Sequence, residues 1–327
     1  MAAPRRKTAM NSSLNQPQFR NAANARQYLE KVRWPKGPVC PHCGSISKDH
    51  YALAGEAHRA GLWKCRDCRE QFSVTVSTVF ERSKIGLHVW LQAVYLLCAS
   101  KKGMSSHQLH RVLGVTYKTA WFMTHRIREA MTLGNLGPIG GKGSIVEADE
   151  TYFGTEEGKS RKGKHGKSKR GGDVLNAMNK IVTLVERGGE ARSFHVADVT
   201  GPNLKGVLYA QIHKETHVMT DASPRYNTVK REQNFAGYDQ VNHQQGEYVR
   251  GIAHTNTVEG YFSILKRGLI GTYHHVASAH LHRYTNEFDF RYNHRTALGY
   301  SDNERTNIVL KEISGKRLTY RRINEAA

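Results

Sequence analysis

Residues 144–149, Ser-Ile-Val-Glu-Ala-Asp, form a short apolar run that closes on an aspartate, and they predict a buried strand. Because successive side chains of a strand point to opposite faces, Glu147 and Asp149 share one predicted face and Glu150 lies on the other. Asp149 is nearest the predicted strand end, where a sheet opens to solvent and substrate. We therefore take Asp149 as a candidate functional acid, although a strand-end carboxylate can also be merely exposed.

Two further acids have comparable contexts. Asp221 closes a second strand-like run, Thr-His-Val-Met-Thr-Asp at 216–221, although it could instead cap the next helix. Glu259 lies within 254–266, His-Thr-Asn-Thr-Val-Glu-Gly-Tyr-Phe-Ser-Ile-Leu-Lys, which has helical periodicity. Two strand-end aspartates and a helical glutamate can converge on divalent ions. Mg²⁺ favours a few carboxylates and keeps positions open for water and phosphate oxygens.

Glu259 has a structural alternative. Residues 256–259, Asn-Thr-Val-Glu, have the spacing of a capping box, in which the glutamate bonds back to the N-cap amide. An apolar stripe would pack this helix on a core: Val258, Phe262, Leu265 and Leu269. Glu259, Ser263 and Lys266 share a different face, and Lys266 follows Glu259 by almost two full turns. A carboxylate and a cation stacked toward one cleft suit a metal ligand with a phosphate contact.

The charge of the chain favours a polyanionic partner. Forty-nine Lys and Arg residues against 28 Asp and Glu residues give a net charge of +21, for which nucleic acid is the default partner. A membrane surface has little support. The most apolar stretch, 85–99, is too short to span a bilayer, and the basic start lacks the apolar segment of a signal peptide.

Four of the five cysteines form two Cys-x-x-Cys pairs, Cys40/Cys43 and Cys65/Cys68, with 21 residues between the pairs. Two such turns can bring four thiolates to one tetrahedral Zn²⁺, so we expect a structural zinc site. A disulfide pair or reactive thiols are the alternative. Cys98 lies in the apolar stretch and is expected to be a small buried side chain.

Between these motifs the chain shows further divisions. Ser105 to Met131 has the sequence pattern of a helix-turn-helix, in which Gly114 marks a tight turn and Thr116 can cap the second helix. Tyr117, Lys118 and Thr119 would then begin the second helix, where base edges are met; an ordinary helical hairpin is the alternative. A Gly-rich hinge follows at 134–143. Residues 159–172 hold seven Lys or Arg and no acid, and are expected to be a mobile loop that contacts DNA phosphates; a loop that is merely solvated is the alternative.

The domains expected from these features are a disordered basic tail at 1–24, a zinc ribbon at 25–82, a helical DNA-binding region at 83–134, a catalytic domain at 144–300 and a C-terminal tail at 301–327. Within the catalytic domain we predict strands at 144–150, 180–187, 192–198 and 216–221, with a helix near 202–213 before the last. This order matches an α/β ribonuclease H-like fold. In that fold the first and fourth strands are central neighbours, so that Asp149 and Asp221 lie side by side.

The chain resembles the DDE transposases of bacterial insertion sequences, in the subgroup with an N-terminal zinc ribbon. The motifs that carry the resemblance are Cys40-Pro-His-Cys-Gly, Trp63-Lys-Cys-Arg-Asp-Cys, Asp149-Glu-Thr-Tyr-Phe-Gly, Thr220-Asp221, His254 to Glu259 with Lys266, and Phe288-Asp-Phe-Arg-Tyr-Asn-His-Arg295. The resemblance implies a ribonuclease H-like core that binds two Mg²⁺ (or Mn²⁺) through the triad Asp149, Asp221 and Glu259. It also implies that Lys266 is a functional lysine.

The implied activity is metal-dependent cleavage of DNA at the ends of an insertion sequence, followed by transfer of the freed 3′-hydroxyl to target DNA. The expected partners are the terminal inverted repeats, the target DNA and further copies of the chain. The expected location is the cytoplasm of a bacterium, in association with the nucleoid. Tyr152 and Tyr261 are interpreted as core or DNA-stacking residues rather than as nucleophiles. Two alternatives remain, a non-catalytic DNA-binding regulator and a hydrolytic nuclease of the same fold.

Overall fold

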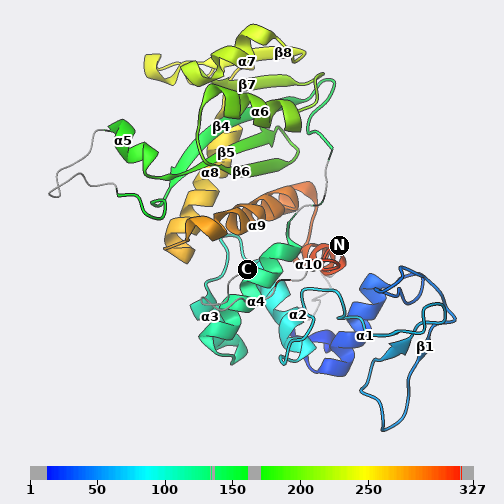
Figure 1. Cartoon of the computed structure of the whole chain (residues 1–327). Coiled ribbons are helices and arrows are strands. Elements are labelled where there is room, and N and C mark those ends of the chain that lie inside the picture. Colours follow the sequence, from blue (N-terminus) through cyan, green and yellow to red (C-terminus); the bar gives the residue numbers. More distant parts are fainter. Residues whose placement is uncertain (1–12, 133, 135–136, 161–170, 317, 319–327) are drawn as a thin grey trace, which may run out of the picture. The chain divides into compact units, whose positions relative to one another are not determined.

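The computed structural model describes residues 13–132, 134, 137–160, 171–316 and 318. The described residues divide into two compact units (Figure 1). One unit takes residues from Met1–Ala99, Ser106–Ala130 and Asp302–Ala327, and the other from Ser100–Ser105 and Met131–Ser301. We call them the N-terminal unit and the sheet unit.

The N-terminal unit joins a small sheet to a group of helices. Its strands β1 (Tyr51–Ala52), β2 (Trp63–Lys64) and β3 (Gln71–Phe72) form an antiparallel sheet in that order. Trp34 packs edge-on against both Trp63 and Phe72, which gives this small sheet an aromatic core. The helices are α1 (Ala22–Arg33), α2 (Leu87–Ala99), α3 (Ser106–Leu113), α4 (Tyr117–Ala130) and α10 (Asp302–Lys311), with short 3₁₀ turns at Ser13–Asn15 and Pro17–Phe19.

Both ends of the chain contribute more to this unit than the sequence predicted. Within the expected tail 1–24, residues 13–24 hold two 3₁₀ turns and the start of α1, and Phe19 is buried. Within the expected tail 301–327, α10 packs against α1 and α2 and buries Val309 and Leu310. A few apolar side chains are enough to pack each segment against the helices of the unit. The composition of each segment is polar on average and therefore does not indicate this packing.

The sheet unit is built on a mixed five-stranded sheet. Its strands are β4 (Ile145–Phe153), β5 (Asn179–Glu186), β6 (Ala191–Val196), β7 (His217–Asp221) and β8 (Gly237–Val241), in the order β6-β5-β4-β7-β8. The β4–β5 and β5–β6 pairs are antiparallel, whereas β4–β7 and β7–β8 are parallel. The predicted neighbourhood of the first and fourth strands is confirmed, and the arrangement is consistent with a ribonuclease H-like core.

The helices of this unit are α5 (Gly171–Asn176), α6 (Gly201–Gln211), α7 (Asn227–Glu232), α8 (Asn256–Gly268) and α9 (Leu281–Asn293). Shorter turns lie at Pro224–Tyr226, His243–Gln245, Ser278–His280 and Thr296–Leu298, and a π-helical turn spans Leu269–Tyr273. The sequence predicted α6 and α8 but not β8, α7 or α9. Of the predicted loop 159–172, residues 161–170 lie outside the described residues, while Gly171 and Gly172 begin α5 rather than continuing a loop.

Each face of the sheet buries its own core. On one face, α8 and α9 pack over β5 in a cluster that includes Ile181, Val185, Phe262 and Phe288. On the other face, α6 packs through Leu204 and Leu208 in a cluster with Val146, Ala148, Val182 and Val218. The alternation of side chains along β4 and β5 therefore decides which residues of β4 meet α8.

Candidate active site

The two aspartates belong to adjacent parallel strands. The β4–β7 pairing runs from Ile145↔His217 to Glu147↔Met219, so continuing the register sets Asp149 level with Asp221. The pairing of β4 with β7 stops two residues before each aspartate, whereas β4 remains paired with β5 as far as Phe153. The sequence predicted that Asp149 lies near the end of its strand, but β4 continues beyond it to Phe153. Asp149 instead lies where β4 and β7 cease to pair.

Strand alternation orients the acids of β4 as predicted. Glu147 and Asp149 pair across from Val185 and Thr183, on the face that packs against α8. Glu150 lies on the opposite face, where its carboxylate accepts hydrogen bonds from Tyr226 Oη at 2.8 Å and Arg225 Nη1 at 2.6 Å. Glu150 is thus held by its own partners, while Asp149 faces the helix that carries Glu259.

Burial and negative neighbours raise the pKa values of both aspartates. Burial is the largest cause for Asp149, followed by the charges of Glu150, Asp221 and Glu259, and together they raise its pKa to about 8. The pKa of Asp221 is also raised, by burial and then by Glu150, against the lowering effects of the Ser223 amide, His243 and Arg225. These carboxylates repel one another at short range, so a cation between them would be stabilising.

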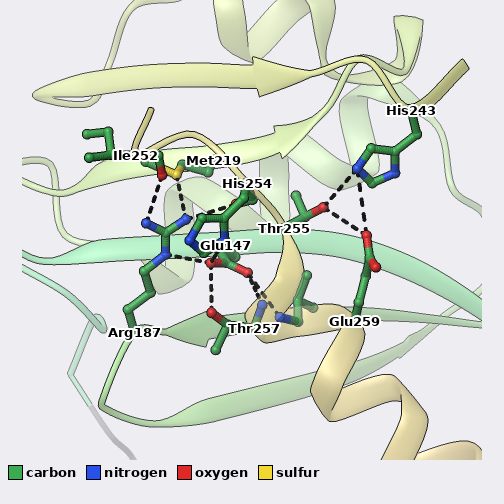
Figure 2. A network of polar contacts seen from close by, with 10 residues as sticks. Glu147, Arg187, Met219, His243, Ile252, His254, Thr255, Thr257 and Glu259 are labelled. Atoms are coloured by element: carbon green, nitrogen blue, oxygen red, sulfur yellow. Dashed lines mark hydrogen bonds and ion pairs between the residues drawn. The ribbon is translucent and has the colours of Figure 1, made fainter. Parts of the chain in front are cut away.

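Glu259 lies in the first turn of α8, close to Thr255 and His243 (Figure 2). Its Oε1 accepts a hydrogen bond from Thr255 Oγ1 at 3.1 Å and lies 3.7 Å from His243 Nε2. Thr255, the N-cap residue, makes no side-chain cap, and the amides of Thr257 and Val258 are bound by Glu147 instead. The helix thus begins one residue earlier than the capping-box alternative requires, and Glu147 performs the capping.

The face pattern of α8 matches the sequence prediction. Val258, Phe262, Leu265 and Leu269 are buried in the core, whereas Glu259, Ser263 and Lys266 are exposed. Tyr261 is buried, with its hydroxyl bonded to Asp289 and Ser193, which supports its interpretation as a core residue. Tyr152 is half-buried and accepts a hydrogen bond from Arg225.

An open pocket of about 480 Å³ is lined in part by Asp221. Its lining comprises Glu150, Asp221, Ala222, Ser223, Pro224, Arg225, Asn242 and His243. Among the described residues, only the four cysteines bring three or more metal-ligating atoms within 4.8 Å of one another.

The two Cys-x-x-Cys turns meet in the N-terminal unit. Cys40 Sγ lies 3.6 Å from Cys68 Sγ, and Cys43 Sγ lies 3.7 Å from Cys65 Sγ. Tetrahedral Zn²⁺ with Zn–S bonds of about 2.3 Å needs sulfurs about 3.8 Å apart, and all five cysteines are free of disulfides. The disulfide alternative is thus wrong, and the cluster indicates a structural zinc site. Cys98 is buried in α2, as predicted.

The predicted DNA-reading residues lie at the start of α4. Gly114 has a φ of +65°, which suits the turn between α3 and α4. The Thr119 amide donates to Thr116 Oγ1 at 3.2 Å, so Thr116 caps α4 as predicted. Tyr117 and Lys118 are exposed, and the Tyr117 ring stacks on His107 with centroids 4.2 Å apart.

Three residues of the site region were assigned no role by the sequence analysis: Glu147, Arg187 and His243. Glu147 offered a signal, because an acid on the inward face of an apolar strand needs a buried partner. That partner, Arg187, lies 40 residues away, and nothing in the local sequence indicates it. His243 stands in a polar segment without periodicity, so its place beside Glu259 follows only from the tertiary fold.

The raised pKa of Asp149 predicts a stability effect. The folded chain, without Mg²⁺, holds a proton on Asp149 up to about pH 8, whereas the unfolded chain loses it near the ordinary value of 3.8. The stabilisation by this proton is fully present below pH 3.8 and is lost as the pH rises through about 8. We therefore expect zinc-loaded Asp149→Asn protein to melt above wild type at alkaline pH, with the difference shrinking in mildly acidic solution.

Thermal melts of both proteins across this pH range, without Mg²⁺, measure the effect. Asp198→Asn, at an exposed acid of the same unit, is the matched control and should follow wild type. A constant difference between Asp149→Asn and wild type at every pH would contradict the prediction.

Comparison with known proteins agrees with this geometry. Residues 140–293 match the sequence model of the ISXO2-like transposase domain, and residues 20–71 match that of the transposase zinc-ribbon domain. The chain is also 29% identical over 258 residues to an "Uncharacterized protein in transposable element ISH50" of Halobacterium salinarum, covering 77% of this chain and 84% of that protein. Within the described ranges, every helix is too short or too polar to span a bilayer.

Proposed function

The chain belongs to the ISXO2-like family of DDE transposases with an N-terminal zinc ribbon, and we propose that it cleaves the ends of its own element and joins them to target DNA. The observation that carries this proposal is the meeting of Asp149 and Asp221 on adjacent strands, under the helix that presents Glu259. Family membership implies DNA binding and a transposase enzyme. The roles of individual residues are our proposal.

We assign Asp149, Asp221 and Glu259 as the ligands of two Mg²⁺ or Mn²⁺ ions. The fit rests on the donor set, because oxygen ligands suit Mg²⁺, and on the burial and the negative neighbours that raise the pKa of Asp149 to about 8. When bound, such ions activate an attacking oxygen and neutralise charge on the phosphate and on the leaving oxygen. The protein's own contribution is to fix three carboxylates on two strands and a helix, so that little rearrangement accompanies the reaction.

Other residues near the site are suited to hold DNA. Lys266 lies almost two turns beyond Glu259 on the same exposed face of α8, where its ammonium can contact a phosphate. In the N-terminal unit, the exposed start of α4 with Tyr117 and Lys118 is assigned to the recognition of terminal repeats. Several copies of the chain on DNA would bring two element ends together.

A strand-transfer assay tests the proposed function. The zinc-loaded chain, with Mg²⁺, is incubated with labelled duplexes that carry the ends of its own element and with a plasmid target. We expect nicking at the element end and covalent joining of the labelled 3′ end to the plasmid. Cleavage without joining would instead indicate a nuclease, and DNA binding without either reaction would indicate a regulator.

A further inference from the structure

Glu147 is the most completely buried acid beside the site, and its carboxylate is fully engaged (Figure 2). Its Oε2 accepts hydrogen bonds from the amides of Thr257 at 2.7 Å and Val258 at 3.0 Å. Its Oε1 accepts from Thr257 Oγ1 at 2.8 Å. The first free amides of α8 are therefore bound by a side chain of β4. A negative charge at a helix N-terminus is also favoured by the helix dipole.

Arg187 completes this contact from the other side. Its Nε donates to Glu147 Oε1 at 2.5 Å, and its Nη1 and Nη2 donate to the carbonyls of Ile252 and His254, each at 2.9 Å. Those two carbonyls belong to the segment that leads into α8. One guanidinium therefore fixes the entry to the helix, while the carboxylate that it neutralises fixes the first turn.

The positions of these contacts relate them to the site. Glu147 precedes Asp149 by two residues on the same face of β4, and Thr257 precedes Glu259 by two residues in the first turn of α8. We propose that Glu147 and Arg187 are positioning residues, which fix Glu259 relative to Asp149 and so hold the metal-binding carboxylates at their working separation. This inference rests on the proposed function of the site.

The physical argument for positioning is that Glu259 has few constraints of its own. Its side chain is 46% exposed and, among the described residues, only Thr255 and His243 hold it by a hydrogen bond or an ion pair. Its backbone, in contrast, belongs to the turn bound by Glu147. Residues that hold a metal ligand in place typically change metal affinity or activity about 10–100-fold when they are substituted.

The test measures Mn²⁺ binding, without DNA, to the zinc-loaded full chain by the electron paramagnetic resonance signal of the free ion. We expect Glu147→Gln to weaken Mn²⁺ binding about 10-fold or more, because an amide cannot accept all these bonds and leaves the Arg187 charge unpaired. The matched control is Glu287→Gln, which breaks another buried Glu–Arg pair, Glu287–Arg291, within α9. The control is expected to lower the melting temperature while Mn²⁺ affinity stays at the wild-type value.

Two milder variants keep the test decisive if Glu147→Gln does not fold. Thr257→Val removes only the hydroxyl that donates to Glu147, whereas Thr257→Ser retains it. We expect Thr257→Val to bind Mn²⁺ several-fold more weakly and Thr257→Ser to match wild type. Equal Mn²⁺ affinity in these two variants, or wild-type affinity in folded Glu147→Gln, would overturn the positioning role.

Mn²⁺ binding by Glu259→Gln distinguishes a failure of the positioning inference from a failure of the proposed metal site. If Glu259→Gln weakens Mn²⁺ binding and Glu147→Gln does not, only the positioning inference fails. If Glu259→Gln itself binds Mn²⁺ as wild type does, the proposed metal site fails, whatever Glu147→Gln shows.

Discussion

Glu259→Gln is expected to slow strand cleavage severely while leaving the fold and DNA binding intact. The substitution removes one negative charge and no volume, and a glutamine oxygen can still accept the hydrogen bond from Thr255 Oγ1. Loss of a metal ligand's charge weakens the binding of the ion that stabilises the transition state. We expect a cost of about 4 kcal/mol, or about 10³-fold in the cleavage rate.

Single-turnover cleavage of a labelled element end, at saturating Mg²⁺, measures this effect. Glu304→Gln is the matched control, because Glu304 is also an exposed glutamate in the first turn of a helix, α10. It should cleave at the wild-type rate. Asp149→Asn and Asp221→Asn should lose activity as Glu259→Gln does, whereas Lys266→Ala should weaken binding of the DNA end more than metal affinity. Near wild-type cleavage by Glu259→Gln would remove Glu259 from the proposed triad.

The site was predictable from sequence to the extent that its chemistry is local. Apolar runs that close on Asp149 and Asp221, together with the order of strands and helices, predicted adjacent central strands, and the sheet order confirms that neighbourhood. The stripe of α8 also follows from local periodicity, because one face must pack on the core. Each of these features depends on a few neighbouring residues and on general rules of strand and helix packing.

What the sequence did not predict depends on contacts between distant residues. The start of α8 is fixed by Glu147, which is 110 positions away from Thr257, and no capping pattern near Asn256 reveals it. Likewise, α10 is packed by Val309 and Leu310 against helices from the other end of the chain. Local composition describes such segments as polar, whereas their burial is decided by partners that only the folded chain brings near.

The other large effect is expected at the cysteine cluster. Four sulfurs held 3.6–3.7 Å apart in pairs have little reason to stay together without a cation, since thiolates repel one another. Structural Zn²⁺ contributes roughly 10–16 kcal/mol in small zinc domains, so metal binding there is folding free energy. We expect about one Zn²⁺ per chain, and expect Cys40→Ser or Cys65→Ser to lose the metal and unfold the small sheet.

Two measurements check this loss. Elemental analysis should give no zinc in the serine variants, and tryptophan fluorescence should shift to the red as Trp34 and Trp63, which pack against each other, enter water. Cys98→Ala is the matched control, because Cys98 is buried in α2 and lies outside the cluster. It should keep its zinc and the emission of Trp34 and Trp63 even if its stability falls. Gently purified wild-type protein without zinc, but with native fluorescence, would show that the small sheet is held by its aromatic core alone.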